Sequence, residues 1–292
     1  MSDLHHLLAT PAYFELTLFL ISIVAGTLGA VLGLGGGIII IPTLTLLFGI
    51  NIRYAIGASI VSIIATSSGA AATYVKDHIT NIRVAMLLEV ATSVGALTGA
   101  LLATVVNGEF LFFLFAILLF YSAIAMLLGG GREHSRMTQP DPLATRLKLN
   151  SSYPDRVLGR EVSYNVTHVT LGFFLMIGAG ILSGLLGIGS GSMKVPAMDR
   201  AMGLPIKVST ATSNFMIGVT GAASAGAYFM RGMILPSLAA PVAIGVLVGS
   251  AIGTRLMVRL PATQIRRAFV VVLVIISIQM GMRGFGFGVH VE

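Results

Sequence analysis

The sequence contains no cysteine and no tryptophan, and only 10% of its 292 residues are charged. The absence of cysteine excludes disulfides, thiolate metal sites and cysteine nucleophiles. Soluble chains carry about 25% charged residues, so the low charge content excludes an ordinary soluble enzyme. No Lys or Arg precedes Arg53. Because a cleavable signal peptide begins with positive charge, the first apolar run is expected to stay in the mature protein.

Apolar residues are abundant: 55% of the chain is hydrophobic and the mean hydropathy is +0.94. A helix of about 20 apolar residues spans a bilayer, and no ten-residue alternating pattern of a membrane β-barrel is present. The sequence therefore predicts an all-α polytopic membrane protein. The apolar runs of the first half are 13–32, 38–50, 54–75, 82–105 and 109–128, and those of the second half are 165–186, 192–204, 208–230, 235–258 and 264–283.

The two halves are related by an offset of 154 residues without a gap. Gly33, Gly35, Gly37 and Pro42 of the first half correspond to Gly187, Gly189, Gly191 and Pro196 of the second. Internal duplication is typical of secondary transporters, whose substrate site lies at the repeat interface near the bilayer midplane. The domain prediction is a first transmembrane repeat over 1–128, a cytoplasmic linker over 129–163 and a second repeat over 164–292.

The net charge of +7 bears on orientation. Lys and Arg gather in cytoplasmic loops beside anionic lipid, so the charge predicts contact with membrane lipid and no nucleic-acid partner. If every run crosses, 13 basic residues fall on one face and 3 on the other; if 38–50 and 192–204 re-enter, the numbers are 10 and 6. The uneven distribution favours five crossings per half, inverted repeats and external termini. The re-entrant alternative stays open, since about 13 residues reach only about 20 Å.

Two glycine-rich segments, 33–37 and 187–191, interrupt the apolar runs at equivalent places. Each is followed by a short apolar run, so a helix starting there directs free N–H groups and the positive end of its dipole into the gap. This pattern predicts an anion site. The alternative is tight helix packing by small residues, which explains single glycines such as Gly95 and Gly99 well. Neither segment fits a nucleotide-binding motif.

At these residues the chain resembles the sulfite exporter TauE/SafE-like anion transporters. The resemblance lies in GAVLGLGGGIIIIPTL (29–44), its echo SGLLGIGSGSMKVPAM (183–198) and the Ser/Thr-rich third span. It implies the movement of small sulfur-containing or carboxylate anions, such as sulfite or sulfonates. The second half departs from symmetry because Ser190 replaces a glycine and Lys194 stands opposite Ile40.

Polar residues in the spans supply the predicted binding groups, since each intramembrane charge is costly and requires a role. Lys194 is expected to give a positive charge to the anion, or else to pair with a carboxylate. Third-span hydroxyls and Asn214 are expected to line the path, with helix–helix hydrogen bonding as the alternative. The predicted substrate-binding residues are Gly35, Gly36, Gly37, Ser59, Ser62, Thr66, Gly189, Ser190, Gly191, Ser192, Lys194, Ser213, Asn214 and Thr220.

Glu89, about eight residues into the fourth span, is a candidate for proton coupling, with a structural hydrogen bond as the alternative. Asp199 is a second coupling candidate, and an interfacial structural role is equally expected for it. Tyr74 and Tyr228 are predicted to lie in an aromatic belt at the membrane surface. A short membrane-surface helix is predicted around 143–149. No metal-ligand cluster and no cofactor motif is present in the sequence.

These features predict a secondary transporter of the inner cytoplasmic membrane that moves a small anion by alternating access and is open to proton coupling. The alternative is a passive anion channel, because the same glycine segments would serve a pore. An intramembrane enzyme is disfavoured, since no nucleophile with a base is visible. The sequence leaves open whether several copies associate into a homo-oligomer.

Overall fold

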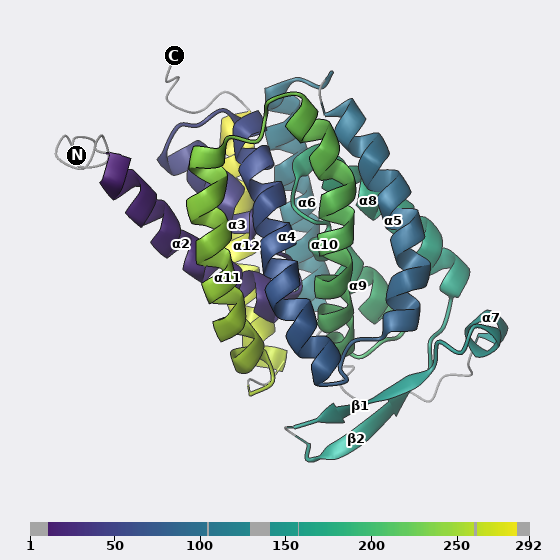
Figure 1. The fold of residues 1–292 in the computed structure, drawn as a ribbon. Helices are drawn as coiled ribbons and strands as arrows, with labels where there is room; N and C mark the ends of the chain where they lie inside the picture. The colour runs from purple at the N-terminus through teal and green to yellow at the C-terminus, as the bar shows by residue number, and fades with distance from the viewer. Residues whose placement is uncertain (1–10, 104, 129–140, 157, 260–261, 285–292) are drawn as a thin grey trace.

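The computed structural model describes residues 11–103, 105–128, 141–156, 158–259 and 262–284 (Figure 1). The remaining part of the predicted linker, 129–140, lies outside the described residues. Helices make up most of the described chain, which confirms the predicted all-α membrane fold. The helices of the first half are α2 (Pro11–Leu32), α3 (Gly37–Pro42), the π-helical turn η1 (Thr43–Leu47), α4 (Ile52–Lys76), α5 (Ile82–Leu102) and α6 (Gly108–Leu128). Those of the second half are α8 (Val169–Leu186), α9 (Gly191–Pro196), the π-helical turn η2 (Ala197–Ala201), α10 (Ile206–Met230), α11 (Pro236–Met257) and α12 (Ala262–Gly284).

Five of these helices are long and apolar enough to cross a membrane by length and composition, namely α2, α4, α5, α8 and α11. Large apolar side chains on their outer faces are exposed, as on α5, where Val90 and Val94 are each 62% exposed. A helix that buries polar residues and exposes apolar ones suits lipid rather than water. The chain is therefore a multi-pass membrane protein.

Equivalent elements of the two halves match closely. The pairs α3/α9, η1/η2 and α4/α10 begin and end at positions 154 residues apart. In Figure 1 the turn between α4 and α5 lies at the lower end of the bundle, and the turn between α10 and α11 lies at the upper end. Inverted repeats require such opposed directions; the orientation of the halves across a membrane stays a prediction.

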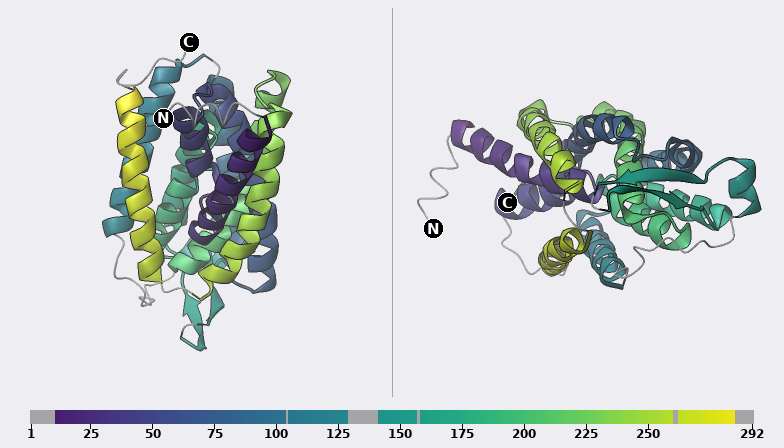
Figure 2. Two further views of the ribbon diagram at one scale, coloured as in Figure 1. Left: turned by 90° about the vertical axis from the view of Figure 1, so that its left-hand side faces the viewer. Right: turned by 90° about the horizontal axis from the view of Figure 1, so that it is seen from below.

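The halves interlock rather than stand side by side. The first helix of each half packs against the fourth helix of the other, α2 on α11 and α8 on α5. Helices α4 and α10 form a central pair, and α6 and α12 pack together at one side of the bundle (Figure 2). Because every main contact joins one half to the other, neither half forms a separate bundle.

Glycines allow the backbones of α5 and α8 to touch. A Cβ atom added at Gly99 would lie 2.0 Å from the carbonyl oxygen of Ile181, and one at Gly95 would lie 2.3 Å from that of Ile177. The equivalent Gly249 and Gly253 face the backbone of α2 in the same way. These single glycines thus serve tight helix packing, as the sequence indicated for Gly95 and Gly99.

We predict that Gly99→Ala lowers the melting temperature of the purified protein in detergent. The new methyl group overlaps backbone that cannot rotate away, and overpacking costs about 1–3 kcal/mol. Gly178→Ala on α8 is the matched control, because a Cβ atom there meets nothing within 4 Å. The control should melt at the wild-type temperature or above it, since alanine favours helix. Equal melting of both variants would contradict this account of the α5–α8 contact.

The linker contains a feature that the sequence did not predict. After α7 (Pro142–Arg146), the strands β1 (Ser151–Asp155) and β2 (Arg160–Tyr164) form an antiparallel hairpin, which projects beyond the lower ends of the helices in Figure 1. The helix predicted around 143–149 corresponds to α7, which ends earlier than expected, at Arg146. The Asp141 carboxylate accepts a hydrogen bond from the Leu143 N–H and so caps the start of α7. It accepts a second hydrogen bond from the Val169 N–H at the start of α8. The N–H groups of Leu143 and Val169 hold the pKa of the Asp141 carboxyl below its usual value.

The hairpin contacts both halves. Asp155 Oδ1 lies 2.8 Å from Lys207 Nζ at the start of α10, and this pair is mostly buried. Arg156 Nη2 lies 3.4 Å from Asp77 Oδ1 after α4, where the arginine side chain is 62% exposed. Asn81 Nδ2 donates to the hydroxyl of Tyr164 at 2.9 Å. The linker is thus an ordered bracket across one end of the bundle.

Candidate functional site

Both predicted breaks are real interruptions of helix. The chain turns between α2 and α3 and between α8 and α9 with left-handed backbone at Gly33 (φ 72°), Gly35 (φ 62°), Gly187 (φ 61°) and Gly189 (φ 72°). Glycine adopts this region without steric cost, so the duplicated glycines are required by backbone conformation. Ser190, with φ 52°, adopts it without being glycine.

Hydroxyl groups of α4 and α10 cross over to the break of the opposite half. Ser59 Oγ donates to the Gly187 carbonyl at 2.5 Å, and the equivalent Ser213 Oγ donates to the Gly33 carbonyl at 2.7 Å. A Cβ atom at Gly191 would lie 2.1 Å from the Gly33 oxygen, so the two breaks also touch directly. Two of the predicted lining serines therefore join the halves in this conformation, which is the alternative that the sequence left open.

The other predicted polar residues have several environments. Asn214 Nδ2 donates to the Ala30 carbonyl at 2.8 Å, and Thr66 donates to the Ser62 carbonyl of its own helix. Ser190 Oγ donates to the neighbouring Gly189 carbonyl. Buried polar atoms without a hydrogen-bond partner include Ser62 Oγ, Ser192 Oγ and Asn214 Oδ1. A role in substrate binding stays a prediction for all of them.

Two equivalent isoleucines fill the space beside the breaks. A Cβ atom at Gly35 would lie 2.8 Å from both Ile217 Cδ1 and Ile63 Cγ2. At Gly189 it would lie 3.3 Å from Ile217 and 3.4 Å from Ile63. Both isoleucines are buried. Apolar side chains therefore fill the space between the two breaks in this conformation.

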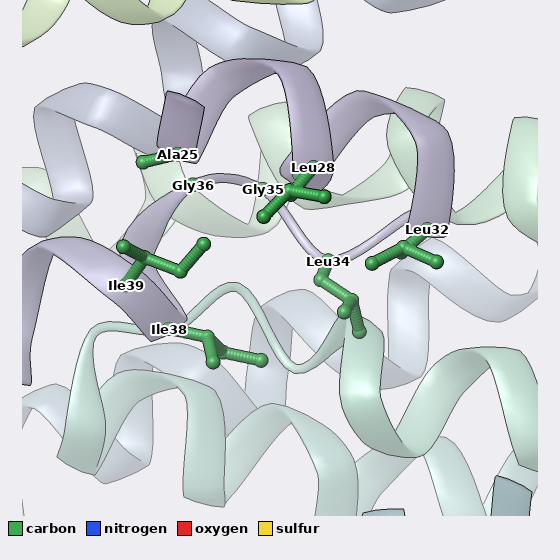
Figure 3. A pocket seen from close by; sticks show the side chains of 9 residues that line it. Ala25, Leu28, Leu32, Leu34, Gly35, Gly36, Ile38 and Ile39 are labelled. Carbon is green, nitrogen blue, oxygen red and sulfur yellow. The ribbon is translucent and has the colours of Figure 1, made fainter. Parts of the chain in front are cut away.

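A small cavity of about 20 Å³ lies beside the first break, between the end of α2 and the start of α3 (Figure 3). It has room for about one water molecule. The side chains lining it, including Leu28, Leu34 and Ile39, are all apolar. No side chain of this cavity could hold an anion.

The second break differs, because a buried ion pair lies beside it. Lys194 of α9 is fully buried, and its Nζ atom lies 3.6 Å from Glu89 Oε2 of α5. The same ammonium donates to Thr220 Oγ1 of α10 at 2.5 Å, and Thr220 donates to Glu89 Oε1 at 2.7 Å. Ser93 Oγ also donates to Glu89 Oε1 at 2.9 Å. Residues from both halves thus form one charged cluster, which we call the Lys194 cluster (Lys194, Glu89 and Thr220).

The sequence singled out each member of the Lys194 cluster but did not place them together. Lys194 pairs with a carboxylate here, which was the alternative expected for it. Glu89 and Lys194 are 105 residues apart in the chain, so no local sequence pattern predicts their contact. The contact depends on the packing of α5 against helices of the second half. Asp199 lies half-buried in η2, beyond α9. Its coupling role stays a prediction.

The first half has no counterpart of the Lys194 cluster. The positions equivalent to Lys194, Thr220 and Glu89 are Ile40, Thr66 and Ala243. Ile40 is fully buried, as an apolar residue is expected to be. Among the described residues, the buried Lys194–Glu89 ion pair is therefore not repeated at the first break.

The prediction of an aromatic belt at Tyr74 and Tyr228 is wrong. Both side chains are buried, at 0% and 2% exposure. Tyr74 OH donates to the Ala30 carbonyl at 3.0 Å and Tyr228 OH donates to the equivalent Gly184 carbonyl at 2.9 Å. Each phenol satisfies a carbonyl in the last turn before a break, where the helix itself supplies no donor.

We predict that Ser213→Ala destabilises the protein. The Gly33 carbonyl would be left buried without this donor, which costs about 1–3 kcal/mol. Ser68→Ala is the matched control, since Ser68 is exposed and donates only within its own helix. Thermal unfolding in detergent without added anion should separate the two variants. An unchanged melting temperature for Ser213→Ala would show that its contact with Gly33 adds no stability.

Among the described residues, no group of three or more His, Cys, Asp or Glu residues is arranged to hold a metal ion. Interlocked, duplicated membrane helices with a buried ion pair at a helix break are typical of polytopic membrane transporters.

Comparison with known proteins gives the family. The pattern described as Sulfite exporter TauE/SafE matches residues 18–280, so the chain belongs to this family. It is 26% identical to the probable membrane transporter protein YunE of Bacillus subtilis, over 91% of this chain and 97% of that protein. It is also 26% identical to the probable membrane transporter protein YdhB of the same organism, over 87% and 93% of the two chains. No solved structure matches. The relatives are named as transporters, and this chain is a membrane transporter.

Proposed function

We propose that the protein is a secondary transporter of the inner cytoplasmic membrane that moves a small anion, such as sulfite, an organosulfonate or a related carboxylate, by alternating access. The observation that carries this proposal is the burial of Lys194 beside the second break. An ammonium group in a membrane interior is costly and marks a substrate or ion pathway. Its ability to donate three hydrogen bonds suits the oxygens of a small oxyanion.

The contacts of Lys194 leave room for such a role. One hydrogen bond goes to Thr220, while Glu89 Oε2 lies at 3.6 Å and has no hydrogen-bond partner. The ammonium, which can donate two further hydrogen bonds, is the group that an arriving oxyanion would use.

Ile63 and Ile217 suggest how access is controlled. They fill the space between the two breaks from equivalent positions on α4 and α10, the central helix pair. The conformation described here is therefore an occluded one in our proposal. Relative movement of α4 and α10 would withdraw the isoleucines and open the Lys194 cluster to one side of the membrane at a time.

We predict that Lys194→Met weakens anion binding about 10- to 100-fold, because a hydrogen bond to a charged group contributes about 1.5–3 kcal/mol. Thermal shift against sulfite, thiosulfate, methanesulfonate and acetate would measure binding, and flux into proteoliposomes would measure transport. Lys76→Met removes an equal charge from the exposed end of α4 and is the matched control. The double variant Lys194→Met/Glu89→Gln removes both buried charges and tests folding. Wild-type flux in a folded Lys194→Met protein would exclude this site.

A passive anion channel is the second candidate, since the glycine breaks would also serve a pore. Counterflow separates the two: a carrier accelerates uptake of labelled anion when unlabelled anion is loaded on the other side, and a channel does not. We expect acceleration, because the two breaks are packed against each other in this conformation.

A further inference from the structure

The Lys194 cluster holds one cation and one carboxylate in a buried environment. Among the described residues of the membrane helices, Glu89 and Lys194 are the charged side chains with less than 9% exposure. The elements packed against Glu89 add no other ionisable group at that depth. Helix α8 carries no titratable residue, and α10 carries Lys207 in its first turn and Tyr228 near its end. The next turn after α9 contains Asp199 and Arg200.

We infer that the carboxylate of Glu89 and an anionic substrate exclude each other at Lys194, so that the protein carries one proton with each univalent anion and moves no net charge. This inference rests on the proposed function of the same site. It adds the charge of the substrate class and the number of protons.

The geometry requires this exclusion. Glu89 Oε2 lies on the ammonium side of the carboxyl group, 3.6 Å from Nζ, and Thr220 binds both partners. An anion that reaches Nζ therefore arrives beside the carboxylate. Two negative groups sharing one buried site cannot both stay ionised, so one of them takes a proton. Glu89 takes the proton when the anion is the conjugate base of a strong acid, because such an anion is the weaker base of the two. Glu89 Oε2, which has no hydrogen-bond partner, is free to hold it.

Charge conservation gives the stoichiometry. In the empty site the ammonium and the carboxylate sum to zero. In the loaded site the ammonium and a univalent anion sum to zero, and the protonated Glu89 is neutral. Both states can therefore change conformation without an uncompensated buried charge, whereas an anion bound without a proton leaves one negative charge in excess. A divalent anion leaves the same excess even with the proton, so univalent anions are preferred.

Proteoliposomes test the inference with two probes whose charge is constant between pH 5 and 8, methanesulfonate (univalent) and thiosulfate (divalent). In the wild type we expect about tenfold accumulation of methanesulfonate for each tenfold proton gradient, no response to a potassium potential set with valinomycin, and a slower flux of thiosulfate. In Glu89→Gln the flux should lose its response to the proton gradient and follow the potassium potential. Glu109→Gln, at an exposed position in α6, should behave as the wild type.

The outcomes separate this inference from the proposed function. Two results would overturn the inference: a wild-type methanesulfonate flux that follows the potassium potential, or a thiosulfate flux equal to that of methanesulfonate. Either result would leave the transporter proposal standing. Absence of flux for both anions contradicts the proposed function itself. Proton uptake on addition of methanesulfonate to the purified protein, read with a pH indicator, gives a second measurement: about one proton per bound anion supports the inference, and none overturns it.

Discussion

The burial of the Lys194 ammonium group away from water is the physical constraint on which the interior of this protein depends. Transfer of an ammonium group into a low-dielectric interior costs several kcal/mol even after relaxation, unless a counter-charge and hydrogen bonds offset it. Lys194 obtains both from outside its own helix, the counter-charge from Glu89 of the first half and the hydrogen bond from Thr220 of the second. The interlocked packing of α5 against α8 and α10 is what brings these groups within reach.

The same requirement applies to the uncharged backbone at the breaks. A helix that ends inside a membrane leaves carbonyl groups without partners, and lipid offers none. Here the carbonyls of Gly33 and Gly187 accept from serines of α10 and α4, and those of Ala30 and Gly184 accept from Tyr74 and Tyr228. In both sets, the two donors occupy equivalent positions 154 residues apart, and so do the two carbonyl groups. Duplication therefore supplied each half with the donors that the interrupted helices of the fold need.

Much of this architecture was readable from the sequence, because apolar runs in a bilayer can only be helices and the repeat aligns without a gap. The positions of the spans and of both breaks followed directly. The roles of Ser59, Ser213, Tyr74 and Tyr228 did not, since a hydroxyl facing a ligand and one facing a carbonyl look alike in sequence. The pairing of Glu89 with Lys194 and the β1–β2 hairpin were also missed, because both depend on contacts between distant segments.

The bracket formed by the hairpin has a mechanical consequence. Its two ion pairs differ in strength, because Asp155–Lys207 is shielded from solvent and Arg156–Asp77 is open to it and to salt. Any force that spreads the halves apart at this end therefore breaks the outer link first. The hairpin then stays joined to α10 through Asp155–Lys207 and to the first half through the buried hydrogen bond between Asn81 and Tyr164. Only the exposed ion pair of this end of the protein is therefore sensitive to ionic strength.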